Sequence, residues 1–344
     1  MEVHHIAVTG AAGLVGRHLL PALADHPGVG RVVGLDVREP ERRPKSVMFH
    51  RVDIAGTSLR PLLEGVDVLV HLAGVVDPVP DEKLMARVNV GGTRHVLEEA
   101  AAVGVRRIVR ISTAAVYGAW PDNPVPLTEE AMLRPNAHFS PAVQGVEVER
   151  LLASWRGDHP DVTVTTLRAA PVVGGGGSER LLARVLLGRP PLRVRGAHLP
   201  VQVLHVDDLV SARVLAATTD LPGVHNVAAD GWLEPRAAAA LLPGSRVPAV
   251  PAEALARALA RAWDLGAGDI PPGIVPYLQH PVVLDTTKLR AAGWAPKVSN
   301  EDALREAVAA MPPRDRRPVI VAGALVSAGV ATTVVVRRRR RKRA

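Results

Sequence analysis

The sequence has no cysteine among its 344 residues, and only 3% of its residues are aromatic. Without cysteine the chain can form neither disulfide bonds nor thiolate metal sites, which suits a reducing cytoplasm. The first residues also lack the basic start and apolar stretch of a secretory signal. Tyr117 and Tyr277 are the two tyrosines. The apolar residues are mainly Ala, Val and Leu, so we expect an aliphatic core.

Most of the chain also lacks an excess of basic over acidic residues, although the formal net charge is +8. Residues 314–317 and 337–343 together carry +9, so residues 1–313 carry −1. A nearly neutral body with a basic tail argues against nucleic acid as a partner.

Short β-branched runs alternate with helical patterns through the first half of the chain. Strands are predicted at residues 5–8, 31–36, 47–52, 66–72, 107–111 and 162–167, and helices at 14–24 and 84–102. This alternation predicts an α/β fold, a Rossmann-type doubly wound parallel sheet with a smaller C-terminal substrate lobe. We expect an NAD(P)-binding core at residues 1–174, a substrate lobe interleaved with the last core elements at 175–310, and a linker at 311–317.

A glycine-rich turn joins the first predicted strand to the first predicted helix. At this spacing Gly10 permits the tight turn, Gly13 lets the backbone approach a pyrophosphate, and Gly16 lets helix and strand pack closely. The helix offers its free N–H groups and positive dipole end to the phosphates. Asp36, which ends the second strand, is placed to accept hydrogen bonds from ribose hydroxyls. Its charge favours NAD over NADP, although Arg38 is near enough to serve a 2′-phosphate.

Further motifs follow in order along the chain. They are His71-Leu72-Ala73-Gly74, Asn89 in Val88-Asn89-Val90-Gly91-Gly92, Ser112-Thr113-Ala114-Ala115-Val116-Tyr117-Gly118, Leu167-Arg168-Ala169-Ala170-Pro171, His205-Val206-Asp207-Asp208, His225-Asn226-Val227-Ala228 and Gly293-Trp294-Ala295-Pro296. Together with the glycine turn they resemble the extended short-chain dehydrogenase/reductases of the NAD-dependent epimerase/dehydratase group, over residues 4–310.

This resemblance implies a set of cofactor-binding residues. They are Gly10, Ala12, Gly13, Leu14, Val15, Gly16, Asp36, Val37, Asp53, Ile54, Leu72, Ala73, Gly74 and Asn89. For Asp53, an adenine contact and a structural helix or turn cap stay open as alternatives. No metal is expected. The family also implies a homodimer through the helix pair that includes residues 147–155.

In that family a tyrosine and a lysine four residues later form a proton relay, and a Ser or Thr holds the substrate oxygen. Thr113 occupies the Ser/Thr position. Pro141 stands in the tyrosine slot and Gly145 in the lysine slot, and residues 118–161 contain no Tyr and no Lys. Proline has no proton to give and glycine has no side chain, so the usual relay is expected to be absent.

Other residues are candidates for substitute donors or for separate sites. Tyr117 is the tentative proton donor, against core packing with a satisfied hydroxyl. His71 and His138 are candidates for a catalytic role as well. The structural alternative for His71 is a buried, hydrogen-bonded side chain, and that for His138 is a solvated side chain on a loop. A metal cluster at His205, Asp207 and Asp208 is disfavoured, as is a phosphate loop at residues 174–177, which lack the following Lys-Ser/Thr.

An uncharged run of 18 residues, 319–336, lies between basic residues at 314–317 and 337–343. As a helix it would extend about 27 Å, close to the ~30 Å hydrocarbon core of a bilayer. We expect residues 318–336 to be transmembrane or membrane-associated, with the basic tail, residues 337–344, on lipid headgroups. This predicts a cytoplasmic domain attached to a membrane, although the positive-inside rule leaves the orientation of the segment open.

Two functions remain open from the sequence. The first is an NAD(P)-binding sensor or regulator without the usual relay. The alternative is an active oxidoreductase or epimerase with a non-standard proton donor, acting on a sugar nucleotide or a similar small molecule.

Overall fold

The computed structural model describes residues 3–175, 181, 185, 192–242 and 249–310. A seven-stranded sheet forms its centre, with strand order β3-β2-β1-β4-β5-β6-β9 and every pair parallel. The strands are β1 (His4–Thr9), β2 (Val29–Asp36), β3 (Val47–Arg51), β4 (Val68–His71), β5 (Arg107–Thr113), β6 (Thr163–Ala169) and β9 (Gly223–Val227). The predicted doubly wound parallel sheet is confirmed.

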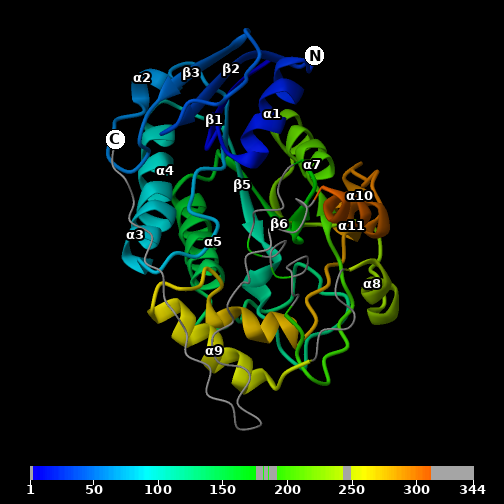
Figure 1. Cartoon of the computed structure of the whole chain (residues 1–344). Helices are drawn as coiled ribbons and strands as arrows, with labels where there is room; N and C mark the ends of the chain where they lie inside the picture. Colours follow the sequence, from blue (N-terminus) through cyan, green and yellow to red (C-terminus); the bar gives the residue numbers. More distant parts are fainter. Residues whose placement is uncertain (1–2, 176–180, 182–184, 186–191, 243–248, 311–344) are drawn as a thin grey trace.

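Helices cover both faces of this sheet (Figure 1). On one face lie α1 (Leu14–Ala24) and α7 (Val206–Thr218), and on the other α2 (Arg60–Leu63), α4 (Gly92–Ala102) and α5 (Ser140–Asp158). Each layer has its own aliphatic cluster, and the strands contribute alternate side chains to the two clusters. Because both faces are covered, the strands are almost continuously apolar, which is why they could be recognised in the sequence.

The smaller lobe lies beyond the carboxyl ends of β5 and β6. It contains α9 (Ala252–Asp264) and the 3₁₀ segment η4 (Pro272–Leu278), which pack on each other (Figure 1). Alongside are α8 (Pro235–Leu241), α10 (Thr287–Ala291), α11 (Asn300–Ala309) and a two-stranded sheet of β7 (Val172–Val173) and β8 (Leu204–His205). The short β9 was not among the predicted strands, because two of its five residues, His225 and Asn226, are polar and it begins with glycine.

The predicted long helix at 84–102 is divided in the structure. It consists of α3 (Glu82–Ala86), a π-helical turn η1 (Arg87–Gly91) and α4. The wide turn contains Asn89, and such turns are often found at functional sites. A second short helical segment, η2 (Ala114–Tyr117), follows β5 directly.

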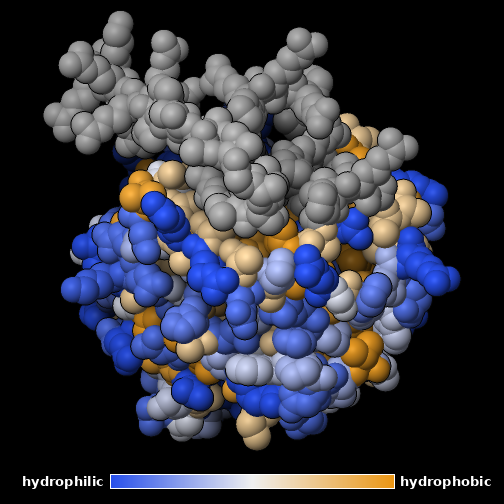
Figure 2. Space-filling view, turned by 60° about the horizontal axis from the view of Figure 1, so that its bottom comes forward, coloured by the Kyte–Doolittle hydropathy of each residue, from blue (hydrophilic) through white to orange (hydrophobic). Residues whose placement is uncertain are grey.

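The face of the body that Figure 2 shows is mostly polar. Hydrophilic side chains cover much of the described face in Figure 2, with separate apolar areas between them. Throughout the described ranges, no helix combines the length and the apolar character that crossing a membrane requires. The predicted membrane segment 318–336 lies outside those ranges, as do the linker and the basic tail.

Candidate cofactor-binding site

The three glycines of the first turn have different surroundings. Gly10 has φ +68°, and a Cβ there would lie 2.6 Å from the backbone N of Ala73. At Gly16 a Cβ would lie 2.5 Å from the carbonyl oxygen of Ala11. At Gly13, the N-cap of α1, a Cβ would meet only the Gly10 carbonyl, at 3.2 Å. Two glycines are thus required by close backbone packing, and Gly13 leaves one side of the turn open to a ligand.

Helix α1 begins at this open side with its positive dipole end uncompensated. No side chain caps its N-terminus, and no acidic residue occurs in its first turn. The first N–H groups of a helix have no partner within the helix, so an anion at Gly13 would find donors ready. This arrangement suits a pyrophosphate.

Asp36 connects the second strand to the glycine turn. Its Oδ2 accepts the N–H of Ala12 at 2.9 Å, and its Oδ1 accepts the N–H of Arg38 at 3.0 Å. The two bonds fix a largely buried carboxylate beside the turn. Each oxygen keeps a lone pair, so the carboxylate can still accept two ribose hydroxyls.

Asp53 is exposed, and its Oδ1 accepts the N–H of Ala55 at 2.9 Å. This bond fits the structural alternative, a turn cap. The adenine contact of Asp53 stays a prediction.

His71 ends β4 inside a closed hydrogen-bond chain. Thr9 Oγ1 accepts the N–H groups of Leu72 and Ala73, both at 3.2 Å, so its own proton goes to His71 Nδ1 at 2.7 Å. His71 Nε2 then donates to Thr93 Oγ1 at 2.9 Å, and that hydroxyl donates to a backbone carbonyl. Burial lowers the pKa of His71 to about 3. The ring is therefore neutral, and its hydrogen bonds support the residues that follow the strand.

Asn89 holds the loop that leaves β4. Its Oδ1 accepts the N–H of Val75 at 2.7 Å, and its Nδ2 donates to the carbonyl of Val75 at 3.1 Å. The same amide donates to Gln144 Oε1 on α5, at 2.9 Å. Because all three bonds are to protein, Asn89 shapes the wall of the site through the backbone.

Thr113 and Tyr117 lie at the end of β5 and in η2. Thr113 Oγ1 accepts the N–H of Ala115 at 3.2 Å and keeps its own proton available. Tyr117 is 1% exposed. Its hydroxyl donates to Asn226 Oδ1 at 2.7 Å and accepts from Arg168 Nη1 at 2.8 Å. Burial raises the pKa of Tyr117. This geometry favours core packing with a satisfied hydroxyl over the tentative catalytic role.

A buried ion pair fixes α5 against the sheet, and no local pattern in the sequence points to it. Arg168 Nη2 on β6 lies 2.7 Å from Glu149 Oε2, and both side chains are less than 8% exposed. Ser112 donates to the other carboxylate oxygen at 2.5 Å. Glu149 thus connects α5 to β6 through Arg168 and to β5 through Ser112.

Pro141 and Gly145, the residues predicted to stand in the family's tyrosine and lysine positions, lie at the start of α5. Pro141 stands in the first turn, where proline is tolerated. Gly145 is buried one turn later, and a Cβ there would lie 2.9 Å from Val116 Cγ1 and 4.0 Å from Thr113 Cγ2. Position 145 therefore lies next to Val116 and Thr113, and as glycine it presents only backbone to them.

The remaining candidates have structural roles or are exposed. His138 is exposed on the loop before α5. His205 caps α7 by accepting the N–H of Asp207 at 3.3 Å. Asp208 accepts the N–H groups of Lys297 and Val298. The described part of the chain contains no group of three or more His, Cys, Asp or Glu side chains suited to a metal ion.

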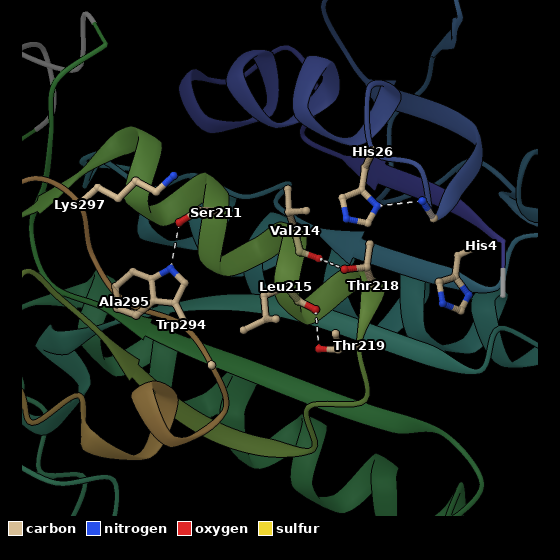
Figure 3. A pocket seen from close by; sticks show the side chains of 12 residues that line it. His4, His26, Ser211, Val214, Leu215, Thr218, Thr219, Trp294, Ala295 and Lys297 are labelled. Atoms are coloured by element: carbon tan, nitrogen blue, oxygen red, sulfur yellow. Dashed lines mark hydrogen bonds between the residues drawn. The ribbon is translucent and has the colours of Figure 1, made fainter. Parts of the chain in front are cut away.

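A hollow of about 540 Å³ lies away from the candidate cofactor site, and Figure 3 shows it from close by. Its lining includes His4 and Gly28, which lie at the amino ends of β1 and β2. Several of its polar side chains bond locally, as when Trp294 donates to Ser211 Oγ at 2.9 Å. The glycine turn, Thr113 and the α5 slots are at the opposite, carboxyl edge of the sheet, which is where ligands bind in open α/β sheets.

Comparison with known proteins agrees with this geometry. Residues 6–228 match the model of the NAD dependent epimerase/dehydratase family, so the chain belongs to that family. It is similar to an uncharacterised protein of Mycobacterium tuberculosis, with 28% identity over 315 residues, 87% of this chain and 81% of the relative. It is also similar to a 3-diazoavenalumate denitrifying reductase from a Streptomyces species, with 34% identity over 257 residues, 69% of this chain and 79% of the relative.

Among solved structures, the UDP-glucose 4-epimerase of Thermus thermophilus, crystallised with NAD, superimposes with a TM-score of 0.67. The two chains are 26% identical, and the match covers 89% of this chain and 98% of the epimerase. The family resemblance inferred from the motifs is confirmed.

Proposed function

We propose that this protein binds NAD at the carboxyl edge of its sheet and does so without a proton relay on α5. The observation that carries the proposal is the bond from the Ala12 N–H to Asp36 Oδ2, which joins the glycine turn to the ribose-binding carboxylate in one rigid unit. The epimerase of similar fold was crystallised with NAD.

The described residues fit the parts of a dinucleotide. The turn at Gly13 and the first N–H groups of α1 would hold the pyrophosphate, and Asp36 would hold the adenosine ribose. Thr113 lies on the side of the site where the nicotinamide end would fall in this family. When bound, the cofactor would supply hydride transfer. The chain's own residues would bind it, orient it and shield it.

Selectivity for NAD gives the first test. Calorimetry of the whole chain should show tighter binding of NAD and NADH than of NADP, because the Asp36 carboxylate repels a 2′-phosphate. Asp36→Asn should narrow this difference by at least about tenfold, equivalent to ~1.4 kcal/mol. The exposed Asp161→Asn, in the turn before β6, serves as the matched control. Absence of binding by all three dinucleotides would refute the proposal.

The function that this arrangement supports best is that of an NAD-binding sensor or regulator. Pro141 and Gly145 offer no proton at the place where the family's chemistry needs one. In that case NAD should bind, and nicotinamide absorbance should stay constant with a broad panel of alcohols, ketones and sugar nucleotides.

A second candidate is a reductase for a small molecule. The similarity to a denitrifying reductase of a diazo compound favours it, because that relative is named for a reduction. Turnover of reduced cofactor with any member of a panel that includes diazo compounds would select this candidate over the sensor.

We also propose that residues 319–336 attach the body to a membrane, on the strength of their length and lack of charge. Liposome flotation of the full chain, compared with a chain that ends at residue 310, tests this. Equal recovery of the two proteins with the lipid fraction would contradict it.

A further inference from the structure

The hollow in Figure 3 lies along one face of α7, at the amino edge of the sheet. The residues of α7 that line it follow the i, i+3, i+4, i+7 spacing of a single helix face; they are Ser211, Val214, Leu215 and Thr218. From the first to the last of them the helix rises about 10 Å. The rest of the wall comes from the start of β1, the turn between α1 and β2, and the segment between α10 and α11. The volume of about 540 Å³ falls in the range of about 300–1,000 Å³ that is usual for small-molecule sites.

One buried side chain in this wall, that of His4, lacks a partner within the described part of the chain. His4 is 8% exposed, and its backbone N–H donates to the carbonyl of Gly28 at 2.9 Å. No described residue forms a hydrogen bond or an ion pair with its imidazole ring, which lines the hollow. Buried polar groups are nearly always hydrogen-bonded, and a neutral imidazole has one donor and one acceptor to satisfy. The ring of His4 therefore points to a molecule that binds in the hollow.

His26 and two threonines lie at the same end of the hollow as His4 (Figure 3). His26 Nδ1 accepts the N–H of Gly28 at 3.1 Å, so the proton of the neutral ring is on Nε2, which can donate. The hydroxyls of Thr218 and Thr219 each donate to a carbonyl one turn earlier in α7, at 2.7 Å, and keep lone pairs that can accept. This end therefore offers both donors and acceptors, which suits a ligand hydroxyl because it gives one hydrogen bond and takes another.

The opposite end of the hollow carries positive charge from Lys297. Its backbone N–H donates to Asp208 Oδ1, in the first turn of α7, at 2.8 Å, and its ammonium forms no ion pair with a described residue. Asp208 itself is 2% exposed, and its other oxygen accepts the N–H of Val298. No Asp or Glu occurs among the described residues that line the hollow. This end therefore favours an anionic group, and the side chains of Val214 and Leu215 between the two ends favour an apolar body.

We propose that the hollow binds a small carboxylic acid that has an apolar body and a hydroxyl at its far end, such as a hydroxyaryl acid. The carboxylate pairs with the ammonium of Lys297, and the apolar body covers Val214 and Leu215. The hydroxyl lies between His4 and His26 and supplies the partner that the His4 ring lacks. Because the hollow is at the edge of the sheet opposite the glycine turn, the acid is bound as an effector, and its binding does not depend on NAD.

Three matched compounds test the chemistry of the ligand. The hydroxy acid 3-(4-hydroxyphenyl)propionate is titrated into the whole chain by calorimetry, beside its amide, which lacks the charge, and 3-phenylpropionate, which lacks the hydroxyl. We expect a Kd of about 1 mM or tighter for the hydroxy acid, and at least about tenfold weaker binding for each of the other two. Equal affinity for the hydroxy acid and either control compound would overturn the proposal, and so would a hydroxy acid that does not saturate by about 20 mM.

Substitutions at the two ends of the hollow test where the acid binds. Lys297→Met removes the ammonium and keeps the backbone bond to Asp208, and His4→Phe removes the unpartnered donor and acceptor. Each should weaken binding of the hydroxy acid at least about tenfold, and Lys83→Met, at an exposed lysine on α3, should not. The side chain of Lys297 is exposed, so this variant keeps the test decisive even if His4→Phe fails to fold. Unchanged affinity in Lys297→Met would contradict the inference.

A competition experiment separates this site from the cofactor site. With saturating NAD present, the hydroxy acid should bind as a further ligand, and neither compound should displace the other. Displacement of the acid by NAD would assign it to the carboxyl edge of the sheet and would overturn the inference.

Discussion

His71 shows how a single buried residue makes stability depend on pH. Its pKa is about 3 in the folded chain and near 6.5 in an unfolded one. Between these values the unfolded state binds a proton that the folded state does not, so stability falls as pH falls. We expect the free energy of unfolding to lose up to about 1.4 kcal/mol per pH unit from this group between pH 6.5 and 3.

Urea unfolding at several pH values checks this, with His71→Asn compared against the parent chain. The variant should be less stable at pH 7 and should show a shallower decline with acid. The exposed His138→Asn should keep the parent slope. Parallel curves for His71→Asn and the parent would contradict the assignment of a buried neutral imidazole.

Tyr117 gives a second prediction at this scale. Tyr117→Phe removes one donor and one acceptor, leaving Asn226 and Arg168 each without that partner in the core. We expect a loss of about 1–3 kcal/mol in the free energy of unfolding, with NAD affinity unchanged. Chemical denaturation and calorimetry on the same sample provide both numbers. Unchanged stability together with lost turnover would instead favour the catalytic role.

At the scale of helices and strands, α5 determines what the site can do. The clash expected at position 145 concerns Val116 on η2, so Gly145→Ala should cost about 1–3 kcal/mol despite the better helix propensity of alanine. Gly157→Ala, on the same helix with nothing within 4 Å, should stabilise by roughly 0.5–1 kcal/mol. Thermal or urea unfolding distinguishes the two variants.

The variant Val116→Ala tests whether Val116 causes the clash expected with a side chain at position 145. Val116→Ala alone should destabilise the chain, because Val116 is fully buried. In that background Gly145→Ala should no longer add a loss, because the smaller side chain at position 116 clears the space. Additive effects of the two substitutions would mean that Val116 and position 145 are not in contact.

Much of the fold and part of the site were predictable from the sequence, for a physical reason. Strands covered on both faces are continuous apolar runs, and the glycine spacing reports backbone constraints that the structure shows at Gly10 and Gly16. The polar β9 and the π turn at Asn89 lack such local signals. The Arg168–Glu149 pair joins residues 19 apart on different elements, and only the folded chain brings them together.

At the scale of the whole molecule, the parallel sheet gathers the functional elements at one edge. The glycine turn follows β1, Asp36 ends β2, the loop held by Asn89 follows β4, and Thr113 ends β5. Helix α5 then places Gly145 against Thr113. The proposed function depends on this combination of a glycine turn at the strand ends with a helix that has Pro141 and Gly145 in its first turns.

The most direct measurement is calorimetric titration of the whole chain with NAD, for the parent, Gly13→Ala and Gly157→Ala. Alanine at position 13 fits the fold, since its Cβ would meet only a carbonyl oxygen at 3.2 Å, but it covers the side open to a pyrophosphate. We predict one NAD per chain for the parent and Gly157→Ala, and at least about tenfold weaker binding for Gly13→Ala with stability retained. No binding by the parent, or equal affinity in all three proteins, would contradict NAD binding at the glycine turn.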